Sequence, residues 1–204
     1  VDGDSSMIND ADSIPLYNVT QKETIDDVMI NPSLTDAQKS DIRSLLEEYR
    51  EIFTDIPSET HLTEHKVVLI QKEPVRCKAY PIPYHLESVM SKELDDIAMG
   101  IIERSDAAYA SPIVLVKKSD NTYRMCINFK ELNKITVFDP EPMMSPDDIF
   151  PKLSGSKFYS TFDFCKGYWA IPMEESSKDC TSFITPRGLM RFRVMPFGMV
   201  NAGS

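Results

Sequence analysis

The chain has 204 residues, of which 42% are hydrophobic and 26% are charged, as in ordinary globular proteins. It contains no run of about 18 apolar residues, which excludes a transmembrane helix. Its first residues, VDGDSSMIND, are acidic and polar, which argues against a secretory signal. The chain starts without Met and ends at Asn201-Ala202-Gly203-Ser204, so we expect a piece of a polyprotein.

The formal net charge of −10 is distributed unevenly. Residues 1–60 hold 14 acidic and 4 basic side chains, whereas residues 61–204 hold 18 of each. A strongly acidic protein would repel nucleic acid, but here the whole imbalance lies in the N-terminal stretch. Two groups of cations stand out, and either could be a solvated face or an anion site: Lys117, Lys118, Arg124, Lys130 and Lys134, and further along Arg187, Arg191 and Arg193.

The cysteines offer no metal or redox motif. No pair has C-x-x-C spacing, which predicts neither a zinc site nor a redox pair, and scattered thiols fit a reducing compartment. They are Cys77, Cys126, Cys165 and Cys180.

The N-terminal half predicts two helices. Residues 1–31 lack periodicity and indicate a linker. Thr35 with Gln38 forms a capping box that begins a helix, and Asp55-Ile56-Pro57 ends it. A second amphipathic helix is expected over residues 86–99. The first helix has an apolar stripe that we expect to be packing surface: Ile42, Leu45, Leu46, Tyr49, Ile52 and Phe53. Between the helices we expect a short strand at 67–70 and an extended arm over 72–83.

Residues 112–118 and 123–129 predict a β-hairpin with a turn at Ser119–Thr122. This hairpin places Lys118 and Arg124 close together on either side of the turn. Two cations held in this way suit an anion such as a phosphate or triphosphate. A solvated hairpin tip is the alternative.

The C-terminal half predicts shorter elements. Ser145 as N-cap, with Pro146 at the first helical position, begins a helix. A second hairpin joins residues 181–185 to residues 189–194. Elsewhere we expect a helical turn at 131–134, an extended arm over 138–146, a bend at 195–198 and a helix starting at the end of the chain.

The stretch from Lys157 to Ile171 reads KFYSTFDFCKGYWAI. Its β-rich, period-two pattern predicts a strand that ends near Asp163, followed by a turn at Gly167 and the aromatic residues Tyr168 and Trp169. An unpaired buried carboxylate is strongly disfavoured. Asp163 therefore either binds a ligand or caps the turn.

Three stretches together resemble the reverse transcriptases of retroelements. Residues 110–134 (ASPIVLVKKSDNTYRMCINFKELNK) are similar to the fingers hairpin, residues 160–172 (STFDFCKGYWAIP) to the first catalytic motif, and residues 189–202 (LMRFRVMPFGMVNA) to the motif just downstream. Upstream, TEHKVVL, CKAYPIPYH and ITVFDPEPM are similar to Pol polyproteins of gypsy-type LTR retrotransposons. The resemblance runs from about residue 35 to the end.

The resemblance implies an α+β fold, the fingers and first part of the palm of a right-hand polymerase. Residues 61–204 would form this part, with a split βαβ palm, and residues 1–60 an acidic linker and helical lead-in. With later palm strands lacking, we expect the C-terminal third to be marginally stable or prone to aggregation.

The resemblance also implies an RNA-directed DNA polymerase that adds dNTPs to a primer on an RNA or DNA template with two Mg²⁺ ions. Asp163 matches the catalytic, metal-binding aspartate, and Phe164 matches a backbone carbonyl ligand of the metal. The remaining matches bind the dNTP: Lys118 and Arg124 the triphosphate, Tyr168 a gate against the ribose 2′-hydroxyl, and Phe197 and Gly198 the pocket lining.

One departure limits the resemblance. The family completes its metal site with a later Y-x-D-D motif, but no Asp-Asp pair follows Asp163 in this sequence. We therefore expect the 204 residues alone to be inactive, and to act with the remainder of a Pol polyprotein in the cytoplasm or a virus-like particle, without a membrane. The alternatives are a catalytically dead remnant that binds nucleic acid or protein, and an acidic adaptor acting through residues 1–60.

Overall fold

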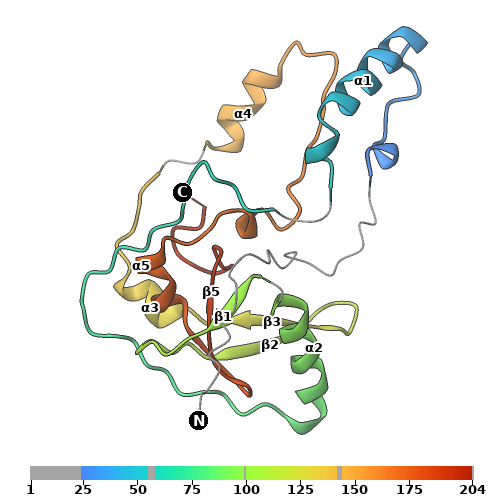
Figure 1. Cartoon of the computed structure of the whole chain (residues 1–204). Coiled ribbons are helices and arrows are strands. Elements are labelled where there is room, and N and C mark those ends of the chain that lie inside the picture. The colour runs from blue at the N-terminus through green and yellow to red at the C-terminus, as the bar shows by residue number, and fades with distance from the viewer. Residues whose placement is uncertain (1–23, 55–57, 99, 142–143, 204) are drawn as a thin grey trace, which may run out of the picture.

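The computed structural model describes residues 24–54, 58–98, 100–141 and 144–203 (Figure 1). Within these ranges no helix is both long and apolar enough to cross a membrane. The helices are α1 (Asp36–Glu48), α2 (Glu87–Ala98), α3 (Lys130–Ile135), α4 (Pro146–Leu153) and α5 (Glu175–Lys178). The strands are β1 (Ile102–Arg104), β2 (Ile113–Lys117), β3 (Tyr123–Ile127), β4 (Phe183–Thr185) and β5 (Gly188–Phe192). Short 3₁₀ helices cover Ile25–Asp27, Arg50–Ile52, Tyr84–Leu86, Gly167–Ala170 and Asp179–Thr181.

Helix α1 begins as predicted, because the Thr35 hydroxyl accepts a hydrogen bond from the Gln38 amide and the Gln38 side-chain oxygen accepts one from the Thr35 amide. Its stripe is not the packing surface that we expected. Only Leu46 is buried, whereas Leu45 and Ile52 are 56% and 71% exposed. Helices α1 and α4 stand apart from the two sheets (Figure 1), and Leu45, Tyr49 and Ile52 of the stripe are left exposed. The predicted helix end at residues 55–57 lies outside the described residues.

The segment from Thr60 to Cys77 is an extended strap rather than part of a sheet. The strand predicted at residues 67–70 does not form. Isolated bridges instead join the strap to three separate segments, through His65 to Met173, Leu69 to Thr136 and Arg76 to Ala110. A regular ladder needs one continuous partner strand, and the strap meets a new segment every few residues.

The core lies between α2 and a three-stranded antiparallel sheet in the order β1-β5-β4. Ile102 pairs with Phe192, and Phe183 with Met190. The apolar face of α2 predicted from the sequence is buried through Met90, Leu94 and Ile97. Hairpin β4–β5 confirms the second predicted hairpin, while β1, α5 and the 3₁₀ helix at Asp179–Thr181 were not predicted.

Strands β2 and β3 form a separate two-stranded sheet and confirm the first predicted hairpin. Helix α3 corresponds to the predicted helical turn, and α4 starts at the predicted Ser145 capping box. The described residues after Gly198 form turns but no helix, contrary to expectation.

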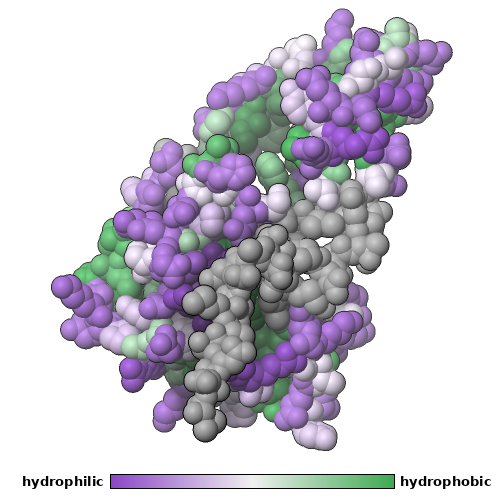
Figure 2. Space-filling view, viewed as in Figure 1, coloured by the Kyte–Doolittle hydropathy of each residue, from purple (hydrophilic) through white to green (hydrophobic). Residues whose placement is uncertain are grey.

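The strand predicted over Lys157–Asp163 does not form. The segment has no regular secondary structure, and Phe158 and Phe162 are 67% and 74% exposed. A strand is stabilised by hydrogen bonds to a neighbour, and no described segment pairs with this backbone. Figure 2 shows further hydrophobic surface at α4, where Ile149, Phe150 and Leu153 are 40%, 66% and 41% exposed.

Candidate functional site

The two hairpin cations lie on one face of the β2–β3 sheet. Val116 is the cross-strand partner of Arg124, and Lys117 that of Tyr123. Lys118 comes next, with its amide bonded to the carbonyl of Thr122 at 2.8 Å. Lys118 and Arg124 are therefore diagonal neighbours on the same face, as expected from the sequence. The opposite face, with Ile113 and Leu115, packs against the core.

Neither cation is neutralised within the described part of the chain. Both side chains are exposed, and no carboxylate lies within 4.0 Å of either among the described residues. The turn carboxylate of Asp120 is instead occupied by Thr122, whose amide and hydroxyl donate to Oδ1 at 2.9 and 2.6 Å. These bonds, with a smaller attraction from Lys118, lower the pKa of Asp120. The outer face of the hairpin thus offers two available cations.

The second cation group is structural rather than available. Arg187 reaches from the β4–β5 turn to Asp95 on α2, with Nη1 2.5 Å from Oδ1. Arg191 contacts Glu103 at 2.6 Å, Asp179 at 2.7 Å and Glu175 at 3.1 Å. Arg193 lies 4.0 Å from Glu103. These arginines link neighbouring elements through ion pairs, so the group is neither a free anion site nor simply a solvated face.

Asp163 is exposed, and so is the following Phe164, at 86%. Within the described ranges no group of three or more His, Cys, Asp or Glu side chains is arranged to hold a metal ion. A divalent hard cation needs several oxygen ligands. One carboxylate and the adjacent carbonyl could contribute to a magnesium site, but these residues alone do not complete one.

A tight turn connects Asp163 to the aromatic residues. Lys166 adopts the left-handed conformation, with φ 49° and ψ 42°. A Cβ on Gly167 would lie 3.0 Å from the Cβ of Phe164, which is tighter than most Cβ contacts in proteins. The turn leads directly into the 3₁₀ helix Gly167–Ala170. A small residue at 167 therefore lets the chain reverse within a few residues of the carboxylate.

The aromatic pair from this helix meets a residue far along the chain. The ring of Phe197 lies 5.0 Å from that of Tyr168 and 5.9 Å from that of Trp169, measured between centroids. The ammonium of Lys166 sits 4.7 Å from the Trp169 ring centroid. Trp169 also packs against the core. The fold thus unites the two stretches predicted to line one pocket.

Gly198 takes φ +92°, a conformation that L side chains rarely adopt. Its carbonyl accepts a hydrogen bond from Asn133 Nδ2 at 2.8 Å, and Asn133 Oδ1 accepts one from the amide of Val200 at 3.1 Å. Asn201 makes a similar pair of bonds to Val137 and Asp139. Neither asparagine belongs to a pattern that the sequence alone reveals, because both bond to backbone that is distant along the chain.

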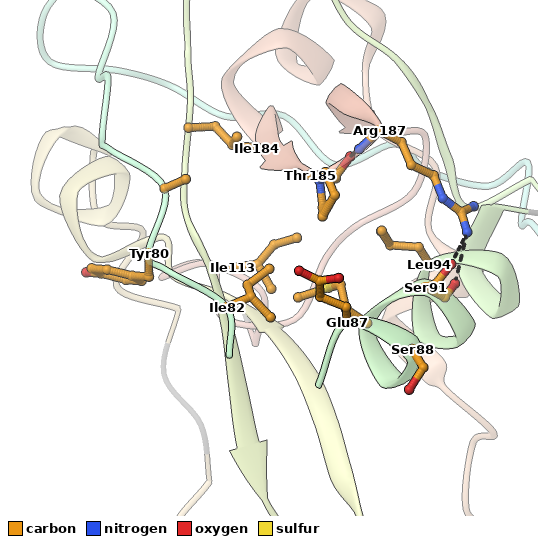
Figure 3. A pocket seen from close by; sticks show the side chains of 13 residues that line it. Tyr80, Ile82, Glu87, Ser88, Ser91, Leu94, Ile113, Ile184, Thr185 and Arg187 are labelled. Carbon is orange, nitrogen blue, oxygen red and sulfur yellow. Dashed lines mark hydrogen bonds between the residues drawn. The ribbon is translucent and has the colours of Figure 1, made fainter. Parts of the chain in front are cut away.

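A separate cleft of about 650 Å³ lies beside α2 (Figure 3). Its apolar lining includes Ile82, Leu94 and Ile113, and Arg187 closes one side through its bonds to α2. None of the residues predicted for metal or nucleotide binding lines this cleft. It therefore takes no part in the predicted site.

The chain is similar to known reverse transcriptases in sequence and in fold. Residues 116–204 match the family described as reverse transcriptase (RNA-dependent DNA polymerase). The Drosophila melanogaster Pol polyprotein from transposon opus is 30% identical over 86% of this chain and 19% of its own length. That from transposon 412 is 33% identical over 79% of this chain and 14% of its own length. The chain thus spans less than a fifth of these curated relatives.

Solved structures show the same fold. A foamy viral protease-reverse transcriptase in complex with an RNA/DNA hybrid superposes with a TM-score of 0.72 at 21% identity. The match covers 83% of this chain and 24% of that protein. The same kind of protein in complex with double-stranded DNA gives a TM-score of 0.70 and covers 37% of that chain. The α+β fold predicted from the sequence is therefore confirmed as a reverse transcriptase fold.

Proposed function

Since this chain belongs with the reverse transcriptases of retrotransposon Pol polyproteins, we propose that it forms the fingers and the first part of the palm of an RNA-directed DNA polymerase. In this role Lys118 and Arg124 bind the triphosphate of the incoming dNTP. Tyr168, Phe197 and Gly198 line the pocket for its sugar and base.

The observation that carries the proposal is the contact of Phe197 with Tyr168 and Trp169. These residues come from two motifs about 30 positions apart, and their rings meet at 5.0 and 5.9 Å. The aromatic cluster adjoins the turn that carries Asp163. The proposed pocket would combine this flat, apolar lining with the carboxylate of Asp163, as nucleotidyl transfer needs.

In this proposal the chain supplies only some of the ligands of the Mg²⁺ site. Mg²⁺ supplies charge stabilisation for the attacking and leaving oxygens in such enzymes. Asp163 and the carbonyl of Phe164 would serve as ligands, with further carboxylates required from residues beyond those given in the sequence. The exposure of Asp163 fits a side chain whose partners are not among the described residues.

The substitution Asp163→Asn tests the proposal in a full-length reverse transcriptase that carries these residues. The amide keeps the size of the side chain but removes the charge that binds metal. We expect primer extension to fall by about a thousandfold or more, with dNTP binding less affected. Asp41→Asn, on the exposed surface of α1, is the matched control. Wild-type rates for Asp163→Asn would refute the assignment.

The chain by itself is expected to be inactive in primer extension, because no Asp-Asp pair follows Asp163. Magnesium-dependent synthesis by the purified 204 residues would contradict this expectation. If the full-length protein is also inactive but retains nucleic-acid binding, the catalytically dead remnant becomes the better description.

We propose an RNA/DNA or DNA template-primer as the macromolecular partner. The similar foamy viral proteins were solved in complex with an RNA/DNA hybrid and with double-stranded DNA, which supports the proposal. Binding should weaken steeply as salt concentration rises. We also propose that the protein acts in the cytoplasm or in a virus-like particle, which fractionation of cells that express the element would test.

A further inference from the structure

We infer that Asn133 and Asn201 are positioning residues that set the floor of the nucleotide pocket. This inference rests on the proposed function. It assigns a role in nucleotide affinity and sugar selection to two side chains that bond only to the protein backbone.

The two asparagines link the same two segments from opposite sides, and we call each set of two hydrogen bonds a bracket. Asn133, on α3, donates to the carbonyl of Gly198 at 2.8 Å and accepts from the amide of Val200 at 3.1 Å. Asn201 donates to the carbonyl of Val137 at 2.8 Å and accepts from the amide of Asp139 at 3.1 Å. Each side chain therefore pairs with backbone as a neighbouring strand would, and joins two segments that share no strand ladder.

Each asparagine uses both its NH₂ group and its carbonyl oxygen, so each site requires a side chain that donates and accepts at once. An asparagine offers a donor and an acceptor on one planar group. If the group were reversed, a carbonyl would face a carbonyl and an amine would face an amide N–H. Aspartate has the same shape but only acceptors when ionised, so it cannot make the bond to Gly198 or Val137.

The bracket acts on the bend that carries Phe197. On the N-terminal side of the bend, the amide of Met195 donates to Ile171 at 2.8 Å. On the C-terminal side Asn133 holds Gly198, whose missing side chain would lie 3.8 Å from the carbonyl of Ile127. The backbone is therefore fixed on both sides of Phe197, while the Phe197 ring remains 51% exposed.

Consequently, the ring of Phe197 is held against Tyr168 by hydrogen bonds to the backbone of Gly198 and Val200, just beyond Phe197 in the chain. Loss of a bracket should let the bend shift and loosen the contact between these rings. If the floor of the pocket moves, we expect a lower affinity for dNTP and weaker discrimination against the 2′-hydroxyl of ribonucleotides. The position of Asp163 should not change.

The chain provides its own reporter. Trp169 is the only tryptophan in the sequence, and its ring contacts Phe197. Movement of Phe197 changes the environment of Trp169 and therefore its emission spectrum and its quenching by acrylamide. This readout needs no polymerase activity and can be measured on the 204-residue chain.

The first arm of the test compares Asn133→Asp, Asn201→Asp and Asn133→Leu with the wild-type chain. We expect stronger quenching and a shifted emission for all three at a temperature where circular dichroism shows folded protein. Asn31→Ala is the control, because Asn31 also makes two hydrogen bonds, both to Ser33, outside the pocket. Lower thermal stability with unchanged Trp169 fluorescence would overturn the inference. If Asn133→Leu does not fold, the fluorescence of the two isosteric aspartate variants tests the inference.

The second arm measures single-nucleotide incorporation by a full-length reverse transcriptase with the same substitutions. We expect the KM for dNTP to rise about tenfold, as for loss of one hydrogen bond to a positioned group, with kcat nearly unchanged and weaker rejection of ribonucleotides. A fall in kcat at constant KM would overturn the positioning role. If the wild-type enzyme makes no DNA, the proposed function fails, while the fluorescence arm still judges the brackets.

Discussion

The ring of Phe197 lies 5.0 Å from the ring of Tyr168, with 58° between their planes. The tilted arrangement is one that aromatic pairs favour. It joins the turn after Asp163 to the bend before Gly198, so two stretches that are separate in sequence form one surface. The following predictions test that surface and the scaffold that supports it.

Tyr168→Ala should relax discrimination against ribonucleotides in a full-length enzyme. In the proposed pocket the phenol ring would occupy the space that a 2′-hydroxyl needs, and its removal would open that space. We expect the ratio of kcat/KM for dNTP to that for the matching rNTP to fall at least tenfold. Tyr80→Ala, in the cleft beside α2, should leave the ratio unchanged. Unaltered discrimination by Tyr168→Ala would refute the gate.

Lys118→Ala and Arg124→Ala should each weaken dNTP binding. A charge-assisted hydrogen bond contributes about 1.5–3 kcal/mol, so the KM should rise by about tenfold or more. Steady-state kinetics across dNTP concentrations would show this. Lys134→Ala is the matched control, since its ammonium already pairs with Glu131 at 2.7 Å. Equal effects of all three substitutions would point to general electrostatics rather than a triphosphate site.

Arg191→Met should destabilise the folded chain by about 2 kcal/mol, because it removes the cation that three carboxylates share. The side chain of Arg191 is 22% exposed and contacts Glu103, Asp179 and Glu175. Urea unfolding should show a lower midpoint with an unchanged m value.

Arg193→Met provides the comparison for this substitution. Its side chain is 45% exposed and only approaches Glu103, at 4.0 Å. We expect a change within about 0.5 kcal/mol. If both variants lost the same stability, the effect would come from net charge and not from the arrangement around Arg191.

Cys180 should make stability fall at alkaline pH. Burial raises the pKa of its thiol from 9.0 to about 12, and the thiol donates a hydrogen bond to the carbonyl of Ser177. The folded state keeps the proton that the unfolded state loses, so this contribution is complete below pH 9 and is lost as the pH rises towards about 12. Urea unfolding of the wild type at pH 8 and pH 10.5 would measure it.

Cys180→Ser provides the matched comparison, because its hydroxyl does not titrate in this range and can still donate to Ser177. The wild type should lose more stability than Cys180→Ser between the two pH values. Parallel losses would show that other groups cause the alkaline instability.

Much of the local structure could be predicted from the sequence because local chemistry determines it. The capping boxes at Thr35 and Ser145 begin α1 and α4 as predicted. Alternation and turn residues placed both hairpins, including the face shared by Lys118 and Arg124. In each case the interacting groups lie within a few residues of one another, so the pattern contains both partners.

Only the tertiary structure decided which groups meet across the chain. The strand predicted up to Asp163 is absent because a strand needs a partner, and its own pattern cannot supply one. In the sequence Arg191 and Lys118 both belong to clusters of cations, and nothing in the pattern separates them. In the fold, three carboxylates from other elements pair with Arg191. The bonds of Asn133 to Gly198 and Val200 depend on a backbone more than sixty residues away. The sequence by itself determined the motifs and the class of chemistry, and long-range packing determined which side chains remain free to perform it.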